Sequence, residues 1–198
     1  MYLRVKRLID FVLSLLALVA LSPLLCVLGL WVKLSSPGPV LFKQERVGIH
    51  KRRFTIYKFR SMRVDAPKDS PTHLLQNAES YITPAGRFLR RSSLDELPQL
   101  FNILRGDMAV VGPRPALYNQ DDLIAERDRY GANDILPGLT GLAQVMGRDE
   151  LPIPEKARLD GEYAKNVSLM LDLRVILRTF TSVLRAEGVV EGSQKPEK

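Results

Sequence analysis

The most extended hydrophobic feature of the chain is an uncharged apolar run from Phe11 to Val32. A helix of that length, at about 1.5 Å per residue, can cross a bilayer. Ser22-Pro23 lies in the middle of the run, and proline there removes a backbone hydrogen bond and bends the helix. Lysine and arginine flank both ends, which indicates that both ends lie on the cytoplasmic side. The pattern predicts a re-entrant helix–break–helix anchor over residues 1–34, with an ordinary kinked spanning helix as the alternative.

A cluster of turn residues occupies positions 35–39. After it, apolar and polar residues alternate, which predicts two strands, Val40 to Val47 and Arg53 to Met62, joined as a hairpin. In the second strand Lys58 and Arg60 follow two apolar residues on the same face, because side chains alternate with a period of two. Two neighbouring cations at the end of a strand indicate an anion contact. A solvated strand face is the alternative.

The remaining pattern is mainly helical. Helical spacing or start signals predict helices that begin at Thr83-Pro84 and that cover residues 95–104, 116–130, 154–166 and 168–186. The last is amphipathic and either packs on the domain or lies in the membrane interface. The polar stretch 65–78 is expected to be a mobile surface loop. We predict an α+β, mainly helical fold with a re-entrant membrane anchor, a small β-hairpin and amphipathic interfacial helices, a cytoplasmic catalytic domain over residues 35–187, and a disordered tail over residues 188–198.

The candidate chemistry centres on Asp95 and Glu96, which precede an apolar repeat of helical spacing. Ser93 with Glu96 three residues later has the form of a capping box, although Pro98 allows the helix to begin at Leu94 or Asp95 instead. Either start places both carboxylates at a helix N-terminus, directly after three arginines that include Arg90. An ionised carboxylate beside arginines is suited to attack a phosphate. Ordinary helix capping is the alternative.

Two later segments carry further candidate ligand contacts. Arg114 lies between Pro113 and Pro115, which restrict the backbone and favour planar, bidentate phosphate recognition; a merely rigid loop is the alternative. Residues 136–148 form a glycine-punctuated loop in which Gln144 and Arg148 are candidate nucleotide or sugar contacts. This loop lacks the spacing of a P-loop or a dinucleotide fingerprint.

Composition narrows the class of partner. The 198 residues carry a net charge of +7, which indicates nucleic acid, a lipid surface or a phosphorylated substrate. Nucleic acid is disfavoured, because aromatic residues that could stack on bases alternate away from Lys58 and Arg60. The single cysteine, Cys26, excludes an internal disulfide. Two histidines are too few for a histidine-rich metal site, whereas an oxygen-liganded cation such as Mg²⁺ is compatible with the sequence.

These motifs, taken in order along nearly the whole chain, resemble the bacterial sugar transferase family, the small monotopic polyprenol-phosphate phosphoglycosyl transferases. The matching segments are residues 6–11, Ser22-Pro23, 37–40, 57–62, 90–101, 106–108, 111–115 and 137–148. The chain departs from the family pattern at Leu142 and Met146, where the family often has Trp and Asn. It also lacks the N-terminal extension of larger relatives, so it resembles the minimal catalytic form.

The resemblance implies an activity and a location. It implies transfer of a sugar-1-phosphate from a UDP-sugar to polyprenol phosphate, with release of UMP, by a monotopic protein at the cytoplasmic face of the bacterial inner membrane. It further implies that Asp95 is the covalent nucleophile, that Glu96, with Asp95, holds Mg²⁺, and that Arg90 and Arg114 contact the diphosphate. A nucleic-acid-binding module or a non-catalytic scaffold, each tethered to the membrane, is the alternative.

Overall fold

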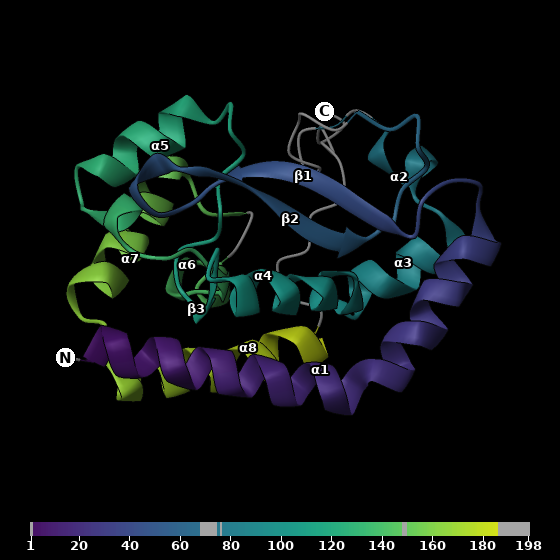
Figure 1. The fold of residues 1–198 in the computed structure, drawn as a ribbon. Coiled ribbons are helices and arrows are strands. Elements are labelled where there is room, and N and C mark those ends of the chain that lie inside the picture. The colour runs from purple at the N-terminus through teal and green to yellow at the C-terminus, as the bar shows by residue number, and fades with distance from the viewer. Residues whose placement is uncertain (1, 68–74, 76, 148–149, 186–198) are drawn as a thin grey trace.

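The computed structural model describes residues 2–67, 75, 77–147 and 150–185. The predicted tail over 188–198, part of the predicted loop over 65–78, and Arg148 lie outside these residues. Helices dominate, as expected, around a two-stranded hairpin (Figure 1). The elements are α1 (Tyr2–Ser35), β1 (Leu41–Val47), η1 (Ile49–Lys51), β2 (Arg53–Phe59), α2 (Ala78–Tyr81), α3 (Pro84–Arg91), η3 (Leu94–Gln99), α4 (Leu100–Arg105), β3 (Ala109–Val111), α5 (Asp121–Asp128), η4 (Ala132–Asp134), β4 (Gly138–Thr140), α6 (Leu142–Val145), α7 (Ile153–Lys165) and α8 (Leu169–Arg185).

Helix α1 forms one side of the molecule and bends between its two halves (Figure 1). Pro23 is inside this helix, and a missing backbone N–H is an established cause of such a bend. The Ser22 hydroxyl donates to the Val19 carbonyl oxygen at 2.8 Å, which satisfies one local polar group. Most of the large apolar side chains of α1 are exposed, and the helix is long and apolar enough to cross a membrane. Its composition therefore supports membrane association.

The first turns of α1 are anchored by buried charge. Lys6 Nζ lies 2.9 Å from Asp172 Oδ2 in α8 and 3.3 Å from Asp10 Oδ2 in α1 itself. Tyr2 donates from its hydroxyl to Asp172 Oδ2 at 2.7 Å. Arg7 donates to the carbonyl oxygens of Ile103 and Leu104 at the end of α4, where helix carbonyls lack intrahelical partners. These contacts hold the apolar anchor against the elements that carry the site.

The predicted hairpin is confirmed. β1 and β2 pair antiparallel in a register that runs from Leu41 opposite Phe59 to Val47 opposite Arg53. Buried Asn102 joins the hairpin to α4, because its side chain accepts from the Tyr57 N–H at 3.1 Å and donates to the Thr55 carbonyl oxygen at 2.7 Å. The hairpin thus lies across η3 and α4 (Figure 1).

A second, parallel pair of short strands, β3 and β4, was not predicted. These strands lie within the segments that the sequence presented as a proline-flanked loop and a glycine loop. Gly138 allows them to approach, because a Cβ atom there would lie 2.1 Å from the Gly112 nitrogen. A core formed by β3, α6, α7 and α8 packs around this pair and includes buried Val111, Leu142, Leu159, Tyr163 and Val175.

Four expectations about helices can be compared with the structure. Thr83 caps α3 by accepting from the Gly86 N–H at 3.0 Å, with Pro84 at the first helical position, as predicted. The capping box at Ser93 is wrong: this residue has a left-handed backbone (φ 55°) and makes no side-chain cap. The helix predicted over 95–104 is a 3-10 turn, η3, followed by α4, because Pro98 cannot donate an intrahelical hydrogen bond. The helix predicted over 116–130 is likewise shorter, since α5 covers only Asp121–Asp128.

Candidate functional site

Asp95 and Glu96 occupy the first turn of η3 and are both buried, with 7% and 9% of their surfaces exposed. A buried carboxylate loses most of its hydration, so it stays ionised only where cations or hydrogen-bond donors replace the water. Glu96 and Asp95 differ in how many cations replace the lost water. This difference gives the two carboxylates different chemical roles in the site.

Glu96 is paired with two cations from separate elements. Its Oε1 lies 2.7 Å from Lys58 Nζ on β2 and 2.7 Å from Arg114 Nη2 after β3, while its Oε2 lies 3.4 Å from Arg114 Nη1. Burial alone would raise the pKa of Glu96, but Arg114 and Lys58 hold that pKa well below its usual range. Glu96 is therefore a permanent anion that ties the hairpin to the loop of Arg114.

Asp95 has no comparable ion pair within the described part of the chain. Burial raises the pKa of Asp95 to about 6, and the neighbouring Glu96 charge adds to this rise, whereas Lys58, Arg90 and Arg114 oppose it. At neutral pH the side chain is mostly ionised but poorly solvated. A carboxylate in that state is a better nucleophile than one already neutralised by a close cation.

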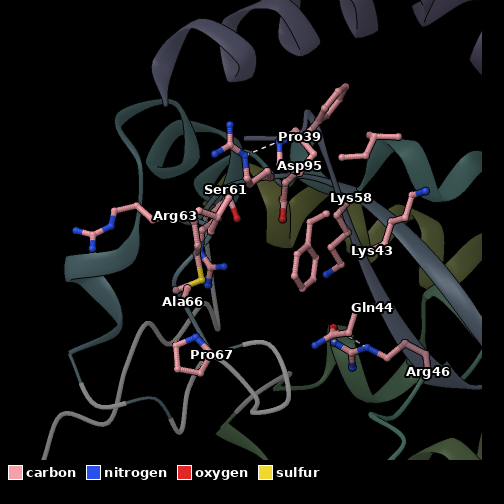
Figure 2. A pocket seen from close by; sticks show the side chains of 17 residues that line it. Pro39, Lys43, Gln44, Arg46, Lys58, Ser61, Arg63, Ala66, Pro67 and Asp95 are labelled. Atoms are coloured by element: carbon pink, nitrogen blue, oxygen red, sulfur yellow. Dashed lines mark hydrogen bonds between the residues drawn. The ribbon is translucent and has the colours of Figure 1, made fainter. Parts of the chain in front are cut away.

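A cavity of about 390 Å³ opens beside Asp95. Figure 2 shows Asp95 and Lys58 pointing into it, with Gln44 and Arg46 on its far side, while Arg63 points away. We call it the cationic cavity and define it by Lys43, Gln44, Arg46, Lys58, Arg90 and Asp95. Its lining favours a polyanionic ligand of the size of a nucleotide.

Arg46 is a member of this site that sequence reasoning missed. It donates to Gln44 Oε1 and to the Pro115 carbonyl oxygen, and burial, with the positive charge of Arg114, lowers the pKa of Arg46 to about 9. Gln44 and Arg46 alternate on β1 in the same way as Lys58 on β2 and Arg60 directly after it, so the same periodicity could have identified them. β2 ends at Phe59, three residues before the predicted end at Met62. What the sequence alone did not provide was the pairing register.

Arg60 lines the cationic cavity, but its guanidinium is bonded to backbone carbonyl oxygens. Its guanidinium donates to the carbonyl oxygens of Pro39 at 2.7 Å and Ser36 at 2.8 Å, and also to that of Pro37. Its side chain is buried, and it closes the end of α1, where the carbonyl groups need donors. Arg60 thus holds the turn after α1, while Lys58 is the cation that contacts Glu96 of the dyad. The phosphate contact predicted for Arg60 stays a prediction, because this residue also lines the cationic cavity.

A second cavity, of about 260 Å³, adjoins the other side of the dyad. We call it the apolar cavity and define it by Glu96, Leu97, Leu139, Val145, Ile176 and Phe180. Gln144, a predicted ligand contact, also lines it; its Nε2 donates to the Leu139 carbonyl oxygen at 3.2 Å. Its buried Oε1 has no hydrogen-bond partner among the described residues. Arg148, the other predicted contact in this loop, lies outside them.

The donor atoms for a metal are few. Within residues 2–67, 75, 77–147 and 150–185, no three His, Cys, Asp or Glu side chains form a group able to hold a metal ion. Mg²⁺ commonly takes one or two carboxylates and completes its shell with water and substrate phosphates. The dyad fits that mode, because Glu96 Oε2 has only the 3.4 Å contact with Arg114 while Oε1 carries both short ones. Ser22 and Pro23, by contrast, line neither cavity and belong to the bend of α1.

Comparison with known proteins identifies the family. The bacterial sugar transferase family matches residues 1–186. A protein of Xanthomonas campestris pv. campestris named UDP-glucose:undecaprenyl-phosphate glucose-1-phosphate transferase is 42% identical over 186 residues, which cover 90% of this chain and 38% of that protein. The exopolysaccharide production protein PSS of Rhizobium leguminosarum bv. phaseoli is 42% identical over 93% of this chain and 97% of its own length.

The uncharacterized sugar transferase EpsL of Bacillus subtilis (strain 168) is 40% identical over 93% of this chain and 89% of its own length. The chain thus spans less than two-fifths of the Xanthomonas protein but nearly all of the two shorter relatives. The match to the family over residues 1–186 agrees with the resemblance noted in the sequence motifs. The chain belongs to the bacterial sugar transferase family.

Proposed function

We propose that this protein transfers a sugar-1-phosphate from a UDP-sugar to undecaprenyl phosphate or a related polyprenol phosphate. The observation that carries the proposal is the asymmetric dyad. A buried Asp95, which has no close ion pair with any described residue, faces the cationic cavity next to a Glu96 held by two cations. The names of relatives from Xanthomonas and Escherichia coli, both UDP-glucose:undecaprenyl-phosphate glucose-1-phosphate transferases, support the same class of substrates.

In the first step Asp95 attacks the sugar-bearing phosphorus of the UDP-sugar. A carboxylate O–P bond forms, the bridging P–O bond of the diphosphate breaks, and UMP leaves with that oxygen. Lys58, Arg90 and Arg114 supply positive charge where negative charge accumulates on the diphosphate. The planar fork of Arg114 holds Glu96 beside Asp95. Partial desolvation of Asp95 raises its reactivity without a separate base.

In the second step a phosphate oxygen of the polyprenol phosphate attacks the same phosphorus. The bond from phosphorus to Asp95 breaks, and the carboxylate is regenerated as polyprenol-diphospho-sugar forms. An acyl phosphate has a good leaving group, so dividing the transfer into two displacements lowers the barrier of each. The low pKa of Glu96 keeps one anion constant beside Asp95 through both steps, and this anion holds Lys58 and Arg114 in place.

We further propose that Mg²⁺ assists and that Glu96, with Asp95, would hold it. When bound it would neutralise charge on the diphosphate. The chain's own cations already provide part of this neutralisation. Activity should therefore depend on Mg²⁺ less steeply in the parent chain than in a variant that lacks Arg114.

The location completes the proposal. We infer that α1 enters and leaves the cytoplasmic leaflet of the bacterial inner membrane, so that the protein is monotopic and the dyad lies at the depth of the acceptor phosphate. The bend at Pro23 and the local bond of the Ser22 hydroxyl support this topology, because an unsatisfied backbone group in hydrocarbon costs several kcal/mol.

The experiment that tests the activity is labelling without acceptor. Incubation with a UDP-sugar radiolabelled in the sugar should leave label on the protein and release UMP, and Asp95→Asn should abolish both. Asp134→Asn, which changes an exposed aspartate on η4, is the matched control and should label normally. Label that persists in Asp95→Asn would assign the nucleophile to another residue.

A further inference from the structure

The two cavities beside the dyad differ in chemistry. The cationic cavity contacts Asp95 and gathers lysine and arginine, whereas no lysine or arginine lines the apolar cavity among the residues described. Glu96 contributes to the apolar cavity and Asp95 to the cationic one. A reaction between a nucleotide diphosphate and a lipid phosphate needs two such different surroundings around one reacting phosphorus.

Two of the hydroxyl groups that line the apolar cavity, those of Thr140 and Thr179, are hydrogen-bonded within the protein. Thr140 Oγ1 and Thr179 Oγ1 lie 2.7 Å apart, and Thr179 Oγ1 also donates to the Val175 carbonyl oxygen at 2.8 Å. The hydrogens of these two hydroxyl groups are therefore not available to a ligand. Besides Ser93, Ser182 and Gln144, most of the remaining lining is hydrocarbon, which includes Leu97, Leu139 and Ile176 and suits an apolar chain.

The apolar cavity is also on the membrane side of the site. Two of its walls come from α6 and α8, and α8 runs along the same side of the molecule as the apolar anchor α1 (Figure 1). Phe180 on α8 lines the cavity and is 65% exposed. Other exposed apolar side chains of the same helix are Leu169, Met170, Leu173 and Leu177. An apolar chain that leaves the cavity past Phe180 would meet this surface.

We propose that the apolar cavity binds the first isoprene units of the polyprenol phosphate, with the phosphate at the dyad and the rest of the chain in the membrane. This inference rests on the proposed function, because it assigns a place to the acceptor of that reaction. About 260 Å³ corresponds to roughly nine liquid-water volumes, so only the start of a long chain is enclosed. Donor and acceptor then approach Asp95 from opposite sides of Glu96.

A protection experiment tests the site without relying on turnover. In a Cys26→Ser background, Ser182→Cys places a thiol in the wall of the apolar cavity and Met62→Cys places one in the cationic cavity. Farnesyl phosphate should slow maleimide modification of the Ser182→Cys protein at least fivefold, and UMP should slow only that of Met62→Cys. Farnesol, which has the same chain without a phosphate, should protect Ser182→Cys far less.

Three results would overturn the assignment: no protection of Ser182→Cys by farnesyl phosphate, equal protection by farnesol, or protection by a UDP-sugar. The last would assign the cavity to the donor sugar, for which the unpaired Gln144 Oε1 is an available acceptor. These results are independent of whether the chain forms a labelled aspartate. A failure of the proposed activity is therefore distinguishable from a failure of this site.

A kinetic test complements the protection experiment. Ile176→Trp should fill the apolar cavity and raise KM for undecaprenyl phosphate at least tenfold, while labelling by the UDP-sugar without acceptor stays normal. Arg174→Trp is the matched control, because Arg174 lies on the same helix, is exposed, does not line the cavity and does not belong to the apolar surface of α8. An unchanged acceptor KM in a folded Ile176→Trp protein would contradict the proposal.

Discussion

Replacing Asp95 by asparagine should abolish transfer and, at the same time, stabilise the fold above pH 6. Burial raises the pKa of this carboxyl from its ordinary value of 3.8 to about 6, so the folded protein holds the proton more tightly than the unfolded chain does. At neutral pH, burial of the ionised Asp95 side chain therefore lowers the free energy of unfolding. Asparagine has nearly the same shape and never ionises.

The size of the effect follows from the shift in pKa. A rise of about two pH units corresponds to ~3 kcal/mol in the free energy of unfolding. Below pH ~4 both states are protonated and the contribution of Asp95 to stability is fully present; it is lost as the pH rises through about 6 and is then constant. The advantage of Asp95→Asn over the parent should thus grow between these values and level off above them.

Urea unfolding of the detergent-solubilised full chain, followed by far-UV circular dichroism across this pH range, measures the difference. Glu96→Gln provides the contrast, because this change removes the anion that Lys58 and Arg114 both contact. It should lower the free energy of unfolding by ~3 kcal/mol or more. Equal stability of Asp95→Asn and the parent at all pH values would refute the claim that Asp95 is held at a desolvation cost. In the parent, kcat/KM for the UDP-sugar should rise with pH and reach a plateau above about 6, because the free enzyme must lose this proton.

Three further outcomes are expected. Arg114→Lys should reduce kcat/KM roughly tenfold to hundredfold despite the conserved charge, because a lysine cannot replace the bidentate fork. Full activity of this variant would show that Arg114 contributes only its positive charge. Arg60→Lys should lower the free energy of unfolding by about 1–3 kcal/mol through lost bonds to buried carbonyl groups, yet leave the KM for the UDP-sugar of the folded protein nearly unchanged; a raised KM would restore the predicted phosphate contact. Single cysteines placed before Leu8 and after Lys33, in a Cys26→Ser background, should both label only from the cytoplasmic side of the membrane, and periplasmic labelling of the first would replace the re-entrant anchor by a spanning helix.

Local patterns in the sequence determined the element types and the positions of the dyad residues. The apolar run around Ser22-Pro23 predicted a long, bent helix, because composition and proline act locally. The alternation before and after residues 48–51 predicted the hairpin. The order of motifs identified the family, and Asp95 and Glu96 could be named because adjacent carboxylates after an arginine cluster are visible without any fold.

Only the tertiary structure decided which of the two dyad carboxylates is ion-paired and which is not. Asp95 and Glu96 are neighbours with nearly the same intrinsic acidity, and their opposite pKa shifts arise because Lys58 and Arg114, from distant segments, both reach Glu96. The hydrogen bonds of Arg60 to the turn after α1 likewise depend on the folded chain, which brings that turn to the end of β2. Arg46 entered the site through the register of β1 against β2 and its bond to Pro115. Burial and long-range ion pairing depend on which segments meet, and no local periodicity specifies that.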